Sequence, residues 1–343
     1  MKILMPGRIL ERHVGGNTTY ARALADGLRA RDVAVDPMAY SDHAVLTMAA
    51  ETRQAMRRGS KNEVLHYVAD TGPLVRTRTP SVVTVHGIAS RWIEGVRNPI
   101  QEKVWRTRVN RAIESTDAVI TVSESSAEDI SEVFDIPRDR IDVIHHGIEH
   151  DSFTRPTVLS PGIAARLPDQ YLLYIGNIEP RKNLTALIAA MRYGCVRDLG
   201  LPLVIAGKPA WNYDASMAAI ADSPDVIYLG FVTDDDRVAL MQQCAMFVFP
   251  SRYEGFGFPV LEAMAAGAPV LTSNEGALRE VAGPARILDS LDEEGIAQGI
   301  TVAIEDMAWR TTSLSEGRAW ASRFNWDASV QAHLAIYKKV SDR

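Results

Sequence analysis

The sequence predicts an α/β protein made of two Rossmann-like domains, each a doubly wound parallel sheet. Short apolar runs alternate with amphipathic stretches along almost the whole chain. Most of these runs are apolar throughout, which is typical of strands that are covered by helices on both faces of a sheet. The chain has 343 residues, more than one hydrophobic core usually organises, so two domains are expected.

Short apolar runs are the candidate strands. In the first half of the chain they are KILMP (2–6), AVDPMA (34–39), EVLHYVA (63–69), SVVTVH (81–86), AVITVS (118–123) and DVIHH (142–146). In the second half they are YLLYIG (171–176), PLVIAG (202–207), VIYLG (226–230), AMFVFP (245–250) and APVLTS (268–273). Each is bounded by polar, glycine or proline residues, as expected of strands.

Amphipathic stretches between these runs are the candidate helices. Examples are TTYARALADGLRA (18–30), KVWRTRVNRAIES (103–115) and NLTALIAAMR (183–192). Near the C-terminus, FNWDASVQAHLAIYKKV (324–340) places Val330, Leu334 and Tyr337 at helical spacing. This last stretch predicts a closing helix.

The alternation pauses between residues 149 and 170, where EHDSFTRPTVLSPGIAARLPDQ contains three prolines and little periodicity. We therefore expect a first domain over 1–150, a linker over 151–170 and a second domain over 171–324. The closing helix over 325–343 is expected to pack back toward the first domain. Ligands of open α/β sheets bind at the carboxyl ends of strands, so a site is expected in strand-to-helix loops facing a central cleft.

Composition excludes several classes of protein. Hydrophobic residues make up 46% and charged residues 23%, which is ordinary for a globular protein. No apolar run approaches the ~20 residues of a membrane span. MKILMPG lacks the pattern of a signal peptide, and two cysteines make no disulfide framework. A reducing cytoplasm is the expected compartment.

Positive charge is concentrated in residues 53–111. This window contains twelve Lys or Arg and four Asp or Glu, a balance of +8, although the whole chain carries −6. The window is either an ordinary solvated surface or a patch for anionic lipid or a pyrophosphate-bearing acceptor. Because the chain as a whole is acidic and carries no nucleic-acid motif, no nucleic-acid partner is expected.

The stretch SRYEGFGFPVLEAMAAGAPVLTS (251–273) places Glu254 and Glu262 on either side of a glycine-containing loop. The loop follows a predicted strand, Pro259 suits the first turn of a helix, and Gly267 would end that helix. Loop and helix-start amides suit an anion, whereas the two carboxylates suit hydroxyl groups of a sugar and a ribose. A simple helix cap would explain the glycines but not two acids at one loop.

This stretch resembles the signature of retaining glycosyltransferase family 4, whose members have the GT-B fold. The resemblance implies that Glu254 approaches the donor sugar and that Glu262 holds the ribose hydroxyls. It also implies that Phe256, Gly257 and Phe258 direct backbone amides at the diphosphate and sugar of the donor.

A second segment, YIGNIEPRKNLTALIAAM (174–191), places Gly176 at a strand end and Arg181 and Lys182 just before a helix. Two cations at such a junction are suited to neutralising a diphosphate leaving group, although an exposed basic turn has the same pattern. The segment resembles G-x-x-x-P-x-K-N of the same family, which implies that Lys182, and with it Arg181, grips the donor pyrophosphate. Asn177 stands where many members carry another cation.

The N-terminal half resembles the family more loosely. Gly15 and Gly16 lie between a first strand and a helix, where they suit a phosphate or an acceptor; a plain turn has the same pattern. His86 ends a strand, and the resemblance implies that it faces the donor sugar. The adjacent histidines at 145 and 146 depart from the family's usual Pro-Asn-Gly. Neighbouring strand residues point to opposite faces, so these two histidines make a poor metal pair.

Two further segments are assigned from the resemblance or from helix chemistry. Asn274 and Glu275 correspond to family positions near the nucleotide, whereas Glu280 is expected to be structural. The acidic run at 234–236 is expected to start a helix rather than to bind a metal.

The resemblance implies transfer of a hexosyl group, with retention and without a metal or other cofactor, from a nucleotide-sugar to a saccharide or lipid-linked acceptor. Arg181, Lys182, Glu254 and His86 would form the catalytic centre, with Glu254 positioning the sugar rather than attacking it. The EPRKN variant resembles bacterial polysaccharide mannosyltransferases. It favours GDP-mannose as donor and the synthesis of cell-surface polysaccharide such as lipopolysaccharide. Peripheral association with the inner face of the plasma membrane is an accompanying expectation.

Alternatives share parts of this pattern. They are a UDP-sugar-using glycosyltransferase, a sugar epimerase or phosphorylase of the GT-B fold, and a non-catalytic nucleotide-sugar-binding protein. A dinucleotide-dependent oxidoreductase is disfavoured because no G-x-G-x-x-G follows an early strand.

Overall fold

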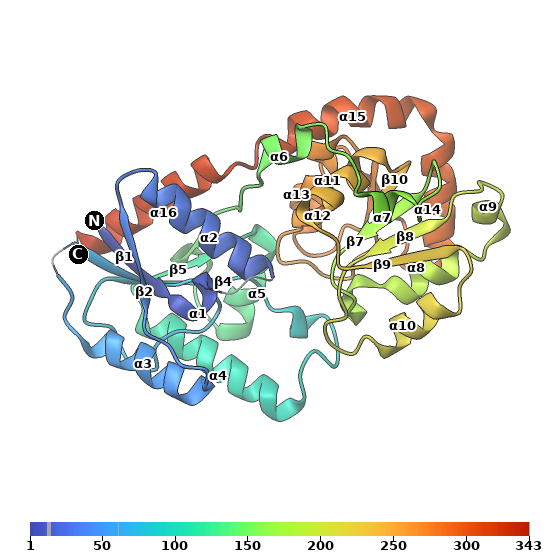
Figure 1. Cartoon of the computed structure of the whole chain (residues 1–343). Coiled ribbons are helices and arrows are strands. Elements are labelled where there is room, and N and C mark those ends of the chain that lie inside the picture. Colours follow the sequence, from blue (N-terminus) through green and yellow to red (C-terminus); the bar gives the residue numbers. More distant parts are fainter. Residues whose placement is uncertain (12–14, 61, 343) are drawn as a thin grey trace. The chain divides into compact units, whose positions relative to one another are not determined.

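The computed structural model describes residues 1–11, 15–60 and 62–342, and the chain divides into two compact units (Figure 1). The first unit contains Met1–Arg91, Arg97–Gly147 and Asn325–Arg343. The second unit contains Trp92–Val96 and Ile148–Phe324. The first unit is therefore assembled from both ends of the chain.

The first unit is built on a parallel six-stranded sheet with the strand order β2-β1-β3-β4-β5-β6. Its strands are β1 (Lys2–Pro6), β2 (Ala34–Met38), β3 (Glu63–Tyr67), β4 (Ser81–Val85), β5 (Ala118–Thr121) and β6 (Ile141–Val143). All six were predicted as apolar runs. Alternate residues of β1 enter opposite cores, Ile3 and Met5 on one face and Leu4 on the other, which explains why the strand is apolar throughout.

Helices cover both faces of this sheet. They are α1 (Gly7–Leu10), α2 (Gly16–Arg29), α3 (Ala44–Met56), α4 (Pro99–Ser115), α5 (Glu124–Phe134) and α16 (Trp326–Ser341). Helix α4 begins with a capping box, in which Asn98 and Gln101 satisfy each other's backbone amides. Helix α16 is the predicted closing helix and packs against α2.

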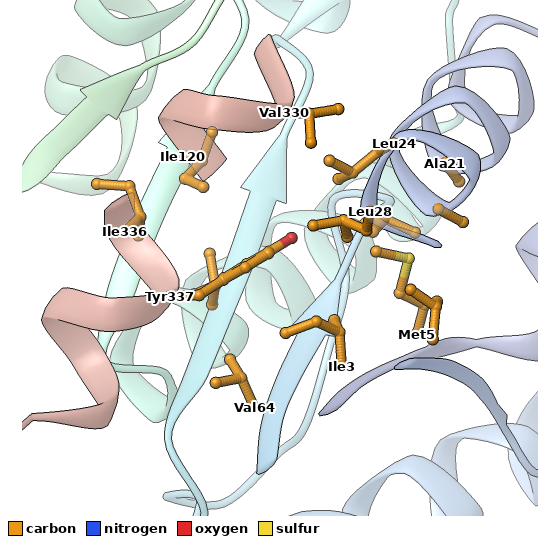
Figure 2. Close-up of a cluster of buried hydrophobic side chains, with 14 of the residues drawn as sticks. Ile3, Met5, Ala21, Leu24, Leu28, Val64, Ile120, Val330, Ile336 and Tyr337 are labelled. Carbon is orange, nitrogen blue, oxygen red and sulfur yellow. The ribbon is translucent and has the colours of Figure 1, made fainter. Parts of the chain in front are cut away.

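One core of the first unit lies between α2, α16 and the sheet (Figure 2). Leu24 and Leu28 of α2 meet Val330 and Tyr337 of α16 there, and all four are fully buried. Burying each side chain of this size contributes about 1.5–3 kcal/mol. The C-terminal residues are therefore part of the N-terminal unit's core.

A polar chain runs through this core, and the direction of its hydrogen bonds follows from one carbonyl. His333 Nδ1 can only donate to the Ser329 carbonyl oxygen (2.7 Å), so Nε2 of a neutral His333 accepts from the Tyr20 hydroxyl (2.8 Å). Tyr20 then accepts from Thr84 Oγ1 (3.0 Å), and Thr84 accepts from His66 Nε2 (2.8 Å).

This series of hydrogen bonds ends at Tyr337, whose hydroxyl donates to His66 Nδ1 (2.7 Å). The buried polar chain thus contains Ser329, His333, Tyr20, Thr84, His66 and Tyr337. The side chains of His333, Tyr20, Thr84, His66 and Tyr337 all have hydrogen-bond partners in it only while both of its histidines are neutral. Burial, together with the nearby histidines, lowers the pKa of His66 well below its ordinary value, and burial lowers the pKa of His333 to about 4.

The second unit is built on another parallel six-stranded sheet, with the order β12-β11-β10-β7-β8-β9. Its strands are β7 (Leu172–Ile175), β8 (Leu203–Ala206), β9 (Val226–Gly230), β10 (Met246–Phe249), β11 (Val270–Thr272) and β12 (Arg286–Ile287). The first five were predicted. Strand β12 was not, because two residues carry no detectable pattern. The prediction of two doubly wound parallel sheets is confirmed.

Along the chain, the helices of the second unit precede, separate and follow these strands. They are α6 (His150–Thr154), α7 (Pro161–Ala164), α8 (Leu184–Ala190), α9 (Gly194–Arg197), α10 (Asp214–Ala221), α11 (Asp234–Gln243), α12 (Phe258–Ala266), α13 (Leu278–Val281), α14 (Glu293–Glu305) and α15 (Met307–Ala321). The segment predicted as a linker contains α6 and α7. Ser160 in it donates its backbone amide to Asp236 of α11 (2.7 Å). Within the described ranges, no helix combines the length and the apolar character needed to span a membrane.

Candidate active site

The loop after β10 places Glu254 at the carboxyl edge of the second sheet. Gly257 ends this loop with φ +112° and caps α12, and a Cβ there would lie 2.9 Å from the Leu278 side chain. The Glu254 carbonyl accepts from the Ala277 amide (2.9 Å), and Gly276 passes so close that a Cβ would lie 2.5 Å from that carbonyl. Glycine at both positions therefore fixes the backbone of Glu254.

The carboxylate of Glu254 is buried and meets both predicted cations. Lys182 Nζ lies 2.5 Å from Oε1, and Arg181 Nη1 lies 2.7 Å from Oε2. Ser251 Oγ also donates to Oε1 (2.6 Å). Arg181 and Lys182 belong to a 3₁₀ turn (Pro180–Lys182) that follows β7, the neighbour of β10 in the sheet. Two segments that were assigned to the donor separately are thus brought together.

Glu179 completes a charge-balanced cluster of two carboxylates and two cations. Its Oε1 lies 2.5 Å from Arg181 Nε, and the Glu179 side chain is only 5% exposed. Arg181 also donates from Nη1 to the Tyr253 carbonyl (3.0 Å). The guanidinium is thus held on two of its edges, which fixes its plane.

Electrostatics keep Glu254 ionised. Burial opposes ionisation of Glu254, but the charges of Arg181 and Lys182 and the hydrogen bonds from Lys182 and Ser251 outweigh it and lower the pKa of Glu254 to about 2. Burial and the Arg181 charge lower the pKa of Lys182, which Glu254 partly opposes. A carboxylate with so low a pKa is a poor proton acceptor near neutral pH. The arrangement suits Glu254 to charge stabilisation and positioning.

Glu262 lies in the second turn of α12 and has a partner that sequence reasoning missed. Arg237 of α11 donates through Nη1 to both carboxylate oxygens, at 2.9 and 2.8 Å. The Arg237 guanidinium also lies over the Phe153 ring, 5.2 Å from its centroid. Arg237 follows the acidic start of α11, and nothing local in the sequence connects it with Glu262. The ribose-binding role of Glu262 remains a prediction.

The other residues predicted to contact the donor lie near the same sheet edge, and their roles stay predictions. Phe256 is buried and packs edge-to-face against Phe258, with 5.2 Å between the ring centroids, so its side chain is structural. Gly176 donates its amide to the Ala206 carbonyl (3.0 Å), so its amide is already used by the sheet. The exposed Asn177 follows it.

Asn274 and Glu275 are exposed after β11, beside the Gly276 that contacts Glu254. The run at 234–236 begins α11, as predicted, with Thr233 accepting the Asp236 amide at the helix start.

The first unit holds the remaining candidates. His86 is half-buried at the end of β4, and its Nε2 donates to the Val68 carbonyl (2.8 Å). Its ring lies edge-on to Tyr20, 5.0 Å between centroids. Gly15, with φ +100°, caps α2 and is exposed together with Gly16, and a Cβ on Gly15 would meet no atom within 4 Å. Residues 12–14 of the same predicted loop lie outside the described residues.

The two adjacent histidines do separate as predicted, since His145 is exposed and His146 is buried. Over residues 1–11, 15–60 and 62–342, no group of three or more His, Cys, Asp or Glu side chains could hold a metal ion.

Two doubly wound parallel sheets, one of which carries a glycine loop between two glutamates beside Arg181 and Lys182, define a protein of the GT-B class. Two family models match the chain. "Glycosyltransferase Family 4" covers residues 14–152, and "Glycosyl transferases group 1" covers residues 160–316. The chain belongs to glycosyltransferase family 4.

Several proteins that are similar in sequence are mannosyltransferases. O-antigen chain mannosyltransferase B of Escherichia coli is 33% identical over 67% of this chain and 62% of its own length. Serotype-specific mannosyltransferase WbdA of Escherichia coli is 34% identical over 65% of this chain and 28% of its own length. The chain thus matches less than two thirds of the length of either relative.

Solved structures share the fold over nearly the whole chain. Sucrose-phosphate synthase from Thermosynechococcus elongatus gives a TM-score of 0.77 with 19% identity, over 98% of both chains. Anabaena HepE in complex with UDP and glucose gives 0.71 with 18% identity, over 100% of both chains. WaaG, a glycosyltransferase involved in lipopolysaccharide biosynthesis, gives 0.69 with 14% identity, over 100% of this chain and 99% of its own.

Proposed function

We propose that this protein transfers a hexosyl group, with retention of configuration, from a nucleotide-sugar to a hydroxyl group of a saccharide or lipid-linked acceptor in cell-surface polysaccharide synthesis. The observation that carries the proposal is the cluster of Glu254, Arg181 and Lys182 beside the Gly257 loop. It places two cations, a carboxylate and the N-terminus of α12 within one strand-end site. A donor diphosphate needs the cations and the helix N-terminus, and its sugar needs the carboxylate.

Binding of the donor would exchange partners within this cluster. The diphosphate would take the place of the Glu254 carboxylate beside Lys182 and Arg181, because these two anionic groups compete for the same two cations. Glu254 would then turn to the donor sugar, where it can accept hydroxyl hydrogen bonds and stabilise positive charge at the anomeric carbon. As the sugar–phosphate bond breaks, charge grows on the departing diphosphate next to Lys182 and Arg181.

The same cations supply the positive charge that a divalent ion would otherwise provide, so the proposed reaction is independent of a metal. Glu254 has a pKa of about 2 and is held by two cations, which suits it to positioning rather than attack. Retention would then follow a front-face route, in which a leaving phosphate oxygen helps to remove the acceptor proton.

The proposed donor is GDP-mannose. Support comes from the names of the similar Escherichia coli proteins, which are mannosyltransferases. A UDP-sugar is the second candidate, because HepE, which shares the fold, was solved with UDP-glucose.

A thermal-shift screen with GDP-mannose, UDP-glucose and the free nucleotides tests the choice, since a ligand at a hundred times its Kd stabilises the native state by about 2.7 kcal/mol. A shift by UDP-glucose alone would overturn the GDP-mannose proposal.

Product analysis tests the reaction itself. Transfer is expected only with acceptor present, and the anomeric configuration of the product by NMR should equal that of the donor. Nucleotide release without acceptor would favour an epimerase, and donor binding without any product would favour a non-catalytic binding protein. Full activity in the presence of a metal chelator is the expected outcome of metal independence.

Peripheral membrane association is also proposed, and a surface of the first unit supports it.

A further inference from the structure

The outward face of α3 is apolar. Exposed positions recur with helical spacing along it, and they include Val45, Leu46, Ala49 and Met56. Val45 is 69% exposed and Leu46 is 55% exposed. Surface helices ordinarily direct such residues to the core, so this face requires an explanation.

The inward face of α3 is polar, which is the reverse of an ordinary surface helix. Glu51 is buried there, with Oε1 3.2 Å from Arg8 Nε. Arg8 and Arg108 both donate to the hydroxyl of Thr71, at 3.4 and 3.5 Å. Arg108 belongs to α4 and lies close enough to Glu51 of α3 to interact with its charge, and the two helices lie on one side of the first sheet (Figure 1).

The outward face of α4 continues the same character. Ile100 is 78% exposed and Val104 is 54% exposed, one turn apart on the first half of the helix. Lys103 and Arg111 are exposed on the same face. We name the outward residues of both helices, together with the Arg57–Arg58 turn after α3, the α3–α4 surface.

Cations without acidic partners lie among these apolar residues. Arg53, Arg58 and Lys103 are exposed, and none of them contacts a carboxylate of the described part of the chain. Most other cations of the 53–111 window are paired with carboxylates, as Arg57 is with Glu63 and Arg106 is with Glu102; the exposed Arg78 is an exception. The excess charge of the window is thus concentrated on the α3–α4 surface.

We propose that the α3–α4 surface docks on a bilayer that contains anionic lipid. Leucine, isoleucine and valine side chains would enter the interfacial region while Arg53, Arg58 and Lys103 meet lipid phosphates. A second copy of this chain would bring the same three cations against one another, which disfavours self-association. This docking rests on the peripheral membrane association proposed above and names its surface and its lipid; it can be measured without a donor or an acceptor.

Vesicle sedimentation of the full chain tests the proposal. Binding should rise as phosphatidylglycerol in phosphatidylcholine vesicles is raised, and it should fall with added salt. Changing Arg53, Arg58 and Lys103 to Gln should weaken binding about fivefold for each cation, or about a hundredfold together. The matched control changes Arg140, Arg197 and Lys338 to Gln, which alters net charge equally at exposed positions elsewhere and should leave binding unchanged.

An apolar variant tests insertion separately. Changing Leu46, Ile100 and Val104 to Ser should abolish vesicle binding, whereas Val158→Ser with Val302→Ser, at exposed positions of the second unit, should retain it. Circular dichroism of all variants should match the parent, because every substituted side chain is exposed. Vesicle binding that does not depend on the fraction of anionic lipid, or an equal loss of binding in both charge variants, would overturn the proposal.

The molecular mass of the protein in solution, measured by light scattering, tests self-association. A dimer that the Leu46, Ile100 and Val104 changes convert to monomer would also overturn lipid docking, in favour of self-association. Transfer to a water-soluble acceptor should be unchanged in the charge variant. A parent chain that binds vesicles but transfers no sugar would refute the proposed function and leave the docking proposal standing.

Discussion

Acidification from pH 7 to pH 5 should destabilise the first unit through its buried histidines. Burial lowers the pKa of His66, His146 and His333 in the folded chain, and neighbouring histidines lower all three further. The groups that face them are Tyr20 from α2, His86 from the end of β4, Tyr337 from α16, and His145, which adjoins His146. Each of these is neutral or repels a new positive charge; the Ser329 carbonyl, which accepts from His333 Nδ1, favours protonation of that histidine, but burial outweighs it.

The magnitude follows from proton linkage. In the unfolded chain each histidine returns to a pKa of about 6.5, so below that pH the unfolded chain binds more protons than the folded chain. The stability contributed by neutral histidines is complete above pH 6.5 and is lost as the pH falls toward the folded pKa, about 4 for His333. Between pH 7 and pH 5 each histidine costs about 2 kcal/mol, and three cost about 6 kcal/mol. That is a large part of the 5–15 kcal/mol typical of a domain.

Urea unfolding at several pH values between 5 and 8, followed by circular dichroism, measures this loss. The variant His333→Gln removes one titrating group and should reduce the pH slope by about one proton, whatever it does to absolute stability. Ala335→Gln, at an exposed and non-titrating position of the same helix, is the matched control and should leave the slope unchanged. A midpoint that stays constant between pH 7 and pH 5, or equal slopes in the two variants, would refute the reasoning.

Three further predictions concern the second unit. Glu254→Ala should abolish transfer in a product assay while circular dichroism stays native, and near-normal turnover would refute the role given to this residue. Arg237→Met should raise KM for the donor about tenfold with a smaller effect on kcat, because Glu262 loses the group that orients it; Arg237→Lys should recover part of the loss. Gly257→Ala should lower the free energy of unfolding by about 1–2 kcal/mol in urea titrations, since φ is +112°, and an unchanged midpoint would contradict this.

Local sequence patterns predicted most of the second sheet and the start of the site. Pro259 at a helix start and Gly267 at its end place α12 at residues 258–266, as the structure has it. Both features act within one turn, so the sequence itself carries them. The two-residue strand β12 has no such pattern and depends on its neighbour β11 for pairing.

Contacts between distant residues could not be predicted. Arg181 and Lys182 were assigned to a diphosphate and Glu254 to a sugar, yet in the structure they are each other's partners across more than 70 positions. The pairing of Arg237 with Glu262 depends on the packing of α11 against α12. Neither contact has a periodicity or a spacing that a single sequence reveals.

The buried polar chain was missed for the same reason. Val330, Leu334 and Tyr337 predicted α16, and His333 shares their helix face by its spacing, but the sequence does not show which polar groups it would meet there. Its partner, the Tyr20 hydroxyl, lies 313 positions away. Only the tertiary fold shows that a histidine on the closing helix is fully buried.

The position of α16 has a consequence for synthesis of the chain on the ribosome. The first unit needs Val330 and Tyr337 to complete its core, so its first 147 residues must wait for residues 325–343. At ordinary rates of translation the wait lasts roughly 10 to 40 seconds. During this interval Leu24 and Leu28 lack their covering helix, while the second unit, which apart from the short segment 92–96 lies within residues 148–324, can fold before the last helix is made. The order of folding is therefore expected to run opposite to the order of synthesis.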